Sequence, residues 1–281
     1  MHQEFSVVTI VKGRIRQLTN LIKSIEKSNV LPAEVIVVWM ASPCSESLIT
    51  SKHFAIQHKF VANDQLPIPR ARNKGLASAL SSHIVYLDVD CICGADTLAR
   101  MVAALQPGRV VTTQIAHLQA LAEHTDYERL AAQTVDQLDY PGVPLETDIS
   151  MSAFHTTAFA LHAEDFNRTG GFDESYSGFG VGDVDFAARC ETSGIHLYIL
   201  PDKILRQFHP RVEPPINHLS DIVHNAAIFK RKWGTYPVKN WLNQFADEGL
   251  INDDFNENGL KVRRLPTKKE ISEHMIYTPD Y

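Results

Sequence analysis

The first half of the chain alternates between strand-sized hydrophobic runs and segments whose apolar residues recur at helical spacing. The continuous, β-branched runs predict buried strands. They lie at 6–11, 34–39, 84–87 and 109–113, and a weaker strand lies at 54–60. Helical spacing predicts helices at 18–25, 69–80 and 95–105. This order of elements predicts an α/β fold with helices on both faces of a mostly parallel central sheet.

The second half of the chain is less regular. Its patterns predict helices at 127–138, 183–193 and 219–233, and strands at 157–161, 196–200 and 204–208. Because the composition does not change along the chain, we expect one domain over residues 1–235, with halves 1–115 and 116–235 sharing one cleft. Residues 236–281 are polar and mixed, and we expect a helical extension packed on that domain.

Charge and cysteine content exclude several classes of protein. The 281 residues carry 27 Lys and Arg against 33 Asp and Glu, a net charge of −6, and 44% are hydrophobic. Disorder is therefore excluded, and the acidic excess argues against nucleic-acid binding. No apolar run approaches the ~20 residues of a membrane span, and no signal-peptide pattern opens the chain. Four scattered cysteines (Cys44, Cys91, Cys93 and Cys190) do not suggest a disulfide framework.

These features together predict a cytoplasmic protein without an integral membrane segment. The predicted helix over 219–233 ends in the basic sequence KRKWG at 230–234. That end is either a solvated helix terminus or a peripheral contact with the inner face of a membrane.

Two carboxylates, Asp88 and Asp90, directly follow the apolar run at 84–87. Ligands of open α/β sheets bind beyond the carboxyl ends of strands, and side chains two residues apart point to the same side. Such a pair suits a hard divalent cation, with Asp90 as its ligand and Asp88 at a ligand hydroxyl or a metal-bound water.

Further motifs accompany this Asp-x-Asp sequence. A basic, helix-opening PRARNKG lies at 69–75, GGFDE lies at 170–174, and GFGVGDVDF lies at 178–186. In this order and spacing, the chain resembles the family 2 glycosyltransferases of the GT-A fold over roughly residues 5–235. Its second half is similar to the galactosyltransferase-type C-terminal region.

The resemblance implies a metal-dependent, inverting transfer of a hexose or N-acetylhexosamine from a UDP-sugar to an acceptor hydroxyl. It makes Asp183 the general base and places Asp90 and His209 on Mn²⁺ or Mg²⁺, with His218 and His224 as alternatives to His209. The acceptor would be a carbohydrate, a lipid-linked sugar or a small molecule. The structural alternative for Asp183 is a helix cap.

The resemblance also distributes binding roles. The first half would bind the nucleotide-sugar through Thr9, Val11 and Arg14 near the base and ribose, Arg72 and Asn73 at the base or diphosphate, and Asp88. Phe179 would stack on a sugar ring or pack beneath the sheet. The acceptor-binding candidates are Tyr176, Phe179 and Gly180. Arg72 and Asn73 have the alternative of an ion-paired helix face.

Two departures keep other functions open. Gly182 stands where the family usually has Glu, and no acid follows the strand at 34–39 to bind uracil. Both favour a catalytically silent nucleotide-sugar-binding module on the same fold. A sugar nucleotidyltransferase is a weaker alternative. That class of enzyme needs a Gly-rich phosphate loop directly after its first strand, and the sequence there, KGRIR at 12–16, has one glycine.

Overall fold

The structure is a computed structural model that describes residues 3–43, 48–61, 66–138 and 140–277. Cys44 lies outside these residues. Cys91, Cys93 and Cys190 are buried free thiols, so they form no disulfide in the described chain.

One large sheet forms the centre of the molecule, with the strand order β3-β2-β1-β4-β9-β6-β10-β5. Its first part is parallel, as the sequence predicts, and consists of β3 (Ala55–Phe60), β2 (Glu34–Trp39), β1 (Phe5–Val11) and β4 (His83–Leu87). All residues of β1 and β2 are buried, which explains why both strands read as continuous hydrophobic runs.

Beyond β4 the sheet is mixed. Antiparallel β9 (Ala158–His162) joins β4 to β6 (Arg109–Leu118), which pairs in parallel with β10 (His196–Arg206). The remaining strands pair antiparallel at its margin: β5 (Cys91–Ile92) and β8 (Asp148–Ile149) with β10, and β7 (Thr134–Leu138) with β6.

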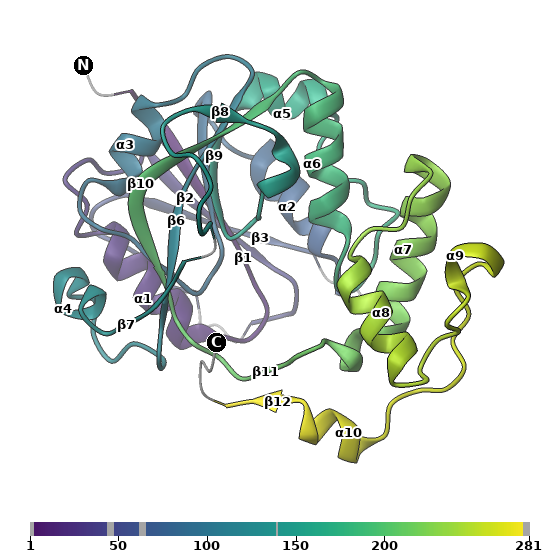
Figure 1. Cartoon of the computed structure of the whole chain (residues 1–281). Coiled ribbons are helices and arrows are strands. Elements are labelled where there is room, and N and C mark those ends of the chain that lie inside the picture. The colour runs from purple at the N-terminus through teal and green to yellow at the C-terminus, as the bar shows by residue number, and fades with distance from the viewer. Residues whose placement is uncertain (1–2, 44–47, 62–65, 139, 278–281) are drawn as a thin grey trace.

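Helices cover both faces of the sheet (Figure 1). On one side lie α2 (Ile68–Ala77), α5 (Ala163–Thr169) and α6 (Gly182–Thr192), and on the other lie α1 (Ile15–Ile25) and α3 (Thr97–Ala103). The apolar face of α1 is buried through Leu18, Leu21, Ile22 and Ile25, as its spacing predicts.

The helix predicted over 127–138 is wrong in its second half. Only α4 (Tyr127–Ala131) is helical, with an N-terminal cap in which Asp126 accepts from the Arg129 amide. The following residues form β7 because β6 runs on to Leu118 and offers its edge for pairing. A second difference is that the two strands predicted at 196–200 and 204–208 form one strand, β10, whose register shifts between Leu200 and Lys203.

The C-terminal part of the chain builds its own apolar cluster beside the sheet. Figure 1 shows α7 (Leu219–Trp233), α8 (Lys239–Asp247), α9 (Phe255–Asn258) and α10 (Lys268–Glu273) together on one side of the molecule. Ile222 of α7 and Leu242 and Phe245 of α8 are fully buried in this cluster, which therefore extends across residue 235. Short strand β12 (Met275–Ile276) pairs with β11 (Arg211–Val212) and ties the chain end to the segment after β10.

Candidate active site

A cavity of about 910 Å³ opens beyond the carboxyl ends of β1 and β4. Segments far apart in the sequence form its walls: the residues after β1, the start of α2, the turn after β4, the loop before α6, the segment after β10, and α8. The predicted site residues that line it are Arg14, Arg72, Asp88, Tyr176, Phe179, Gly180, Asp183 and His209.

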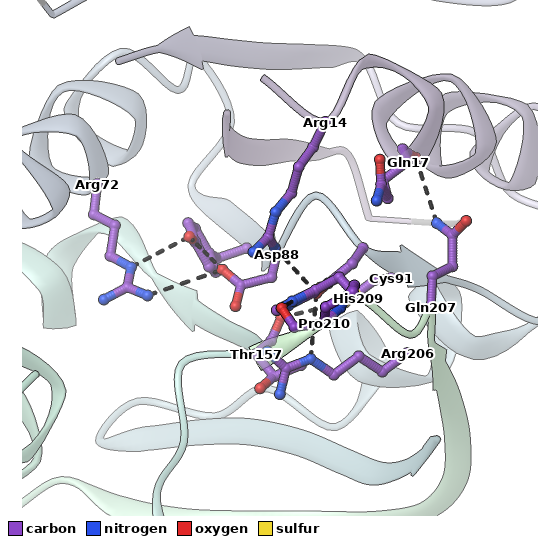
Figure 2. A network of polar contacts seen from close by, with 12 residues as sticks. Arg14, Gln17, Arg72, Asp88, Cys91, Thr157, Arg206, Gln207, His209 and Pro210 are labelled. Carbon is purple, nitrogen blue, oxygen red and sulfur yellow. Dashed lines mark hydrogen bonds and ion pairs between the residues drawn. The ribbon is translucent and has the colours of Figure 1, made fainter. Parts of the chain in front are cut away.

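Asp90 is buried, with 1% of its surface exposed, and does not itself line this cavity, although three side chains that contact it do. Its Oδ2 atom lies 3.4 Å from Arg14 Nη1, from Arg206 Nε and from His209 Nε2. Figure 2 shows these three side chains, Arg14 from the residues after β1 and Arg206 and His209 from the end of β10 and the residues after it. Its Oδ1 atom is buried and has no hydrogen-bond partner among the described residues. Burial alone would raise the pKa of Asp90, but Arg206, with help from His209, holds it well below its usual value. The carboxylate is therefore ionised and has one oxygen available for a ligand.

Asp88 belongs to a second polar group, with Tyr86 and Arg72. Its Oδ1 accepts a hydrogen bond of 2.8 Å from the Tyr86 hydroxyl and lies 3.9 Å from Arg72 Nη2. Arg72 is itself fixed, because it donates to Tyr86 at 3.2 Å and to the Thr156 hydroxyl at 2.7 Å. Burial raises the pKa of Asp88, and the charge of Arg72 opposes that rise.

Asp183 lies in the first turn of α6 and faces the cavity. The N-cap of this helix is Val181, at a φ of 71°, so Asp183 is not the cap residue. Its Oδ1 accepts a hydrogen bond from the neighbouring Val184 amide, at 3.1 Å. Asp185, two residues further along α6, is fully buried and accepts a hydrogen bond from the Tyr176 hydroxyl at 3.0 Å. The two acids therefore differ: Asp185 anchors the helix and Asp183 is presented to the cavity.

The start of α6 is also braced by α7. Trp233 Nε1 donates to Asp185 at 2.8 Å, and Lys232 Nζ lies 2.8 Å from the same oxygen. Lys232 reaches Asp173 of the GGFDE segment as well, at 2.8 Å. This buried group of charges fixes the helix that carries Asp183 relative to the C-terminal part of the chain.

The glycine-rich loop at 178–182 is held firmly by α7. Asn225 is fully buried and donates to the carbonyl oxygens of Ser177, Phe179 and Gly180 at 2.8–3.3 Å. Asp221 accepts the Phe179 amide at 3.1 Å. The Phe179 ring stacks on His218 with centroids 4.5 Å apart. The glycines thus permit positive φ angles in a braced loop.

The sequence model of glycosyltransferase-like family 2 matches residues 12–212 of the chain. The chain belongs to this family. It is a glycosyltransferase, and its mixed α/β architecture with a large central sheet is the GT-A fold. No match is found among the curated proteins.

Solved glycosyltransferases share this fold at low sequence identity. S. aureus TarS 1–349 matches with a TM-score of 0.59 and 14% identity, over 91% of this chain and 75% of that one. GalNAc-T7, solved with UDP, GalNAc and Mn²⁺, matches with a TM-score of 0.57 and 15% identity, over 88% of this chain and 54% of that one. PcManGT of Pyrobaculum calidifontis is a mannosyltransferase solved in complex with GDP-Man and Mn²⁺. It matches with a TM-score of 0.55 and 18% identity, over 84% of this chain and 66% of that one.

Three predicted nucleotide-sugar contacts of the glycosyltransferase do not line the cavity. Thr9 and Val11 are fully buried within β1, while Ile10 and Lys12, on the opposite side of the same strand run, do line it. Asn73 bonds the backbone of Phe172 through both its amide nitrogen and its oxygen, at 2.8 Å each. Asn73 therefore holds the GGFDE segment on α2.

The three candidate histidines occupy different places. His209 lies at Asp90, and its Nδ1 is 3.2 Å from the Pro210 carbonyl oxygen. His218 lies under Phe179 with Nδ1 3.7 Å from Asp221. His224 is exposed on α7 and does not line the cavity. Of the three, His209 is the one in contact with the Asp-x-Asp carboxylates.

The protein's own side chains supply only part of the ligands that a divalent cation would need at this site. The free Oδ1 of Asp90 and the nearby His209 ring are suitable ligand atoms. Within the described residues, no group of three or more His, Cys, Asp or Glu side chains is arranged to hold a metal. A cation here would complete its coordination with donor phosphate oxygens and water, as Mg²⁺ sites at phosphates usually do.

Some lining residues were not predicted as site residues. Arg206 lies in the segment with His209, and alternation along β10 would have drawn attention to it. Lys12 and Ile10 follow from the same period-two argument on β1. Trp241 of α8 carries no sequence signal, because its place in the cavity depends on how the C-terminal helices pack.

None of the helices in the described chain is both long and apolar enough to cross a membrane.

Proposed function

We propose that this glycosyltransferase transfers a hexose or N-acetylhexosamine from a UDP-sugar to an acceptor hydroxyl, with inversion of the anomeric carbon and with Mn²⁺ or Mg²⁺. The observation that carries the proposal is that Asp88 from the first half of the chain lines one cavity with His209 and Asp183 from the second, and that His209 contacts Asp90. A carboxylate–imidazole pair and a separate acid are the parts that such a displacement needs.

The negative charge of the departing nucleoside diphosphate must be stabilised as its bond to the sugar breaks. Arg14 and Arg206 both reach Asp90, and both line the cavity. A bound cation would act there as a Lewis acid on the diphosphate oxygens. Asp90 would hold it with His209, while the two guanidinium groups orient the phosphates.

Asp183 is the proposed general base. It would accept the proton of the acceptor hydroxyl as that oxygen attacks the anomeric carbon from the face opposite the diphosphate. One bond to the acceptor oxygen forms while the bond to the diphosphate oxygen breaks, so a single displacement inverts the centre. The bracing of α6 through Asp185 supports this role, because a base must be held in a fixed position.

The choice of UDP rests on the fold relatives. Structures of TarS hold UDP and UDP-GlcNAc, whereas PcManGT holds GDP-Man. In this chain the residues nearest the carboxyl ends of β1 and β2 that line the cavity are Ile10, Lys12 and Met40. A base would therefore lie beside two apolar side chains and Lys12, and no carboxylate from the described residues directly after β2 lines the cavity.

A catalytically silent nucleotide-sugar-binding module is the alternative, and Gly182 favours it. A side chain at this position would have room, because an added Cβ would meet nothing closer than 3.6 Å, at Pro69. Packing around the Cβ position therefore does not require glycine here, and the absence of the family's usual Glu removes one acceptor contact.

The experiment that separates these functions is release of nucleoside diphosphate from a panel of UDP- and GDP-sugars, measured with Mn²⁺, with Mg²⁺ and with EDTA. The proposal predicts metal-dependent turnover of at least one UDP-sugar that is stimulated by saccharide acceptors. Tight, metal-dependent binding of UDP-sugars with no turnover would support the silent module. Preferential turnover of GDP-sugars would overturn the donor assignment.

A further inference from the structure

One oxygen of the Asp90 carboxylate is surrounded by the protein's own basic side chains. Its Oδ2 atom lies 3.4 Å from nitrogen atoms of Arg14, Arg206 and His209 (Figure 2). Of the charges that lower the pKa of Asp90, that of Arg206 has the largest effect. The Oδ1 atom, in contrast, is buried and has no hydrogen-bond partner among the described residues. The chain itself therefore neutralises this carboxylate, and does so at one oxygen only.

The protein offers a divalent cation few other ligand atoms nearby. Asp88 Oδ1 is engaged by the Tyr86 hydroxyl, which donates to it at 2.8 Å, and lies 3.9 Å from Arg72 Nη2. A cation at Asp90 would thus find the Oδ1 atom and the His209 ring, whereas a hard divalent cation takes about six ligands. It would also meet the like charge of two guanidinium groups on the same carboxylate.

The two guanidinium groups are free to change partner. The side chains of Arg14 and Arg206 are 39% and 32% exposed, and both line the cavity in which the proposed donor binds. Guanidinium groups form strong, bidentate hydrogen bonds with phosphates. A diphosphate in the cavity would draw both arginines away from Asp90 and would add phosphate oxygens as cation ligands. One molecule would therefore remove the competing charges and complete the coordination.

From these contacts we propose that Arg206, together with Arg14, competes with the divalent cation for Asp90, so that the cation binds tightly only when a nucleoside diphosphate is present. The inference rests on the proposed metal-dependent reaction and adds a control on when the metal enters. Such coupling is reciprocal, because the cation must raise the affinity for the diphosphate by the same factor. It also gives Arg206 a signature that a simple binding residue lacks: its removal strengthens cation binding to the protein alone.

Calorimetric titration of the intact protein with Mn²⁺, in the presence and absence of UDP, tests this coupling. In the wild type, UDP should raise the affinity for Mn²⁺ by about ten-fold or more. In Arg206→Gln, the affinity for Mn²⁺ without UDP should rise by about three- to ten-fold, because a competing charge is lost. The affinity of the same variant for UDP without metal should fall. Arg206→Lys retains the charge and should stay close to the wild type in Mn²⁺ binding without UDP.

Arg100→Gln is the matched control, because Arg100 of α3 also pairs with an aspartate, Asp202 at 3.3 Å, but does not line the cavity. It should leave both affinities unchanged. Arg14→Gln is a second variant that should act in the same direction as Arg206→Gln, and thermal unfolding shows that each variant is folded.

Two results would overturn the inference and leave the proposed reaction standing. One is a wild type that binds Mn²⁺ equally well with and without UDP. The other is a pair of folded variants, Arg206→Gln and Arg14→Gln, that bind Mn²⁺ alone no more tightly than the wild type does. Donor turnover in EDTA, with no Mn²⁺ binding even in the presence of UDP, would instead reject the proposed use of metal together with the inference.

Discussion

Nε2 of His209 lies 3.4 Å from Oδ2 of Asp90, which joins the segment after β10 to the turn after β4 at a single oxygen atom. Arg14 and Arg206 approach the same oxygen at the same distance, while the second oxygen of the carboxylate is buried and has no hydrogen-bond partner among the described residues. Asp90 therefore balances positive charge from both halves of the chain and keeps one oxygen for a ligand.

Replacing Asp90 should impair the metal-dependent use of the donor while the protein still folds. In Asp90→Asn the carboxylate charge between Arg14 and Arg206 is lost, and Mn²⁺-dependent turnover of the donor should fall by about 10²–10³-fold. Calorimetric titration of Mn²⁺ in the presence of UDP should show weaker binding. His209→Gln should weaken binding in the same way, and the exposed His224→Gln should not. Loss of metal dependence in His224→Gln alone would contradict the assignment of His209.

Asn225 should control the glycine-rich loop. Asn225→Ala removes the hydrogen bonds to three loop carbonyls and to the Ser177 amide, leaving buried groups unsatisfied. The free energy of unfolding should fall by about 1–3 kcal/mol in urea denaturation, and the KM for the acceptor should rise more than the KM for the donor. His224→Ala, an exposed change on the same helix, is the control. Unchanged stability and unchanged acceptor KM would show that α7 does not hold the loop.

Gly171 in the GGFDE segment should be required by packing. Its φ is +71°, and an added Cβ would lie 2.8 Å from Asn73 Oδ1 and 2.9 Å from the Phe166 ring. Gly194 has a similar φ of +68° with nothing within 4 Å, so Gly194→Ala measures the backbone cost alone, about 1–2 kcal/mol. Gly171→Ala should cost about 1–3 kcal/mol more, from crowding. Equal losses of unfolding free energy in the two variants would remove the packing explanation.

The pairing of β12 with β11 should weaken at alkaline pH. A hydrogen bond to the Glu270 backbone, supported by the charge of Glu248, raises the pKa of His274 above its usual value of 6.5. The stabilisation is therefore fully present below pH 6.5 and is lost as pH rises through the raised pKa. Hydrogen exchange of the Glu213 amide, which donates to the His274 carbonyl oxygen beside this pairing, should accelerate over this interval, beyond the intrinsic increase. His274→Gln should show no such step, and a step that persists in it would assign the effect to another group.

Much of the fold could be predicted from local pattern because the buried parallel strands read as continuous apolar runs. The parallel order of β1, β2 and β4 and the buried face of α1 follow directly from such runs. The second half of the predicted helix over 127–138 forms β7 instead, because the partner strand β6 decides its conformation. Pairing between segments is a tertiary effect that helical spacing does not contain.

Some residues of the candidate site could likewise be predicted from the sequence, and others depend on tertiary structure. Motifs placed Asp88, Asp183 and His209 at the cavity, since their order along the chain carries the family resemblance. Thr9 and Val11 lie within β1 and away from the cavity, because a one-residue difference along a strand exchanges its two faces. The place of Trp241 depends on the packing of α7 against α8, for which the sequence offers only amphipathic helices.

The central claim is that Asp183 removes the proton from the acceptor hydroxyl, and a comparison of binding with turnover in Asp183→Asn tests it most directly. The variant should bind UDP-sugar and Mn²⁺ as tightly as the wild type, while single-turnover transfer falls by about 10²–10⁴-fold. Transfer by Asp183→Asn at the wild-type rate, with donor and metal bound, would contradict the claim.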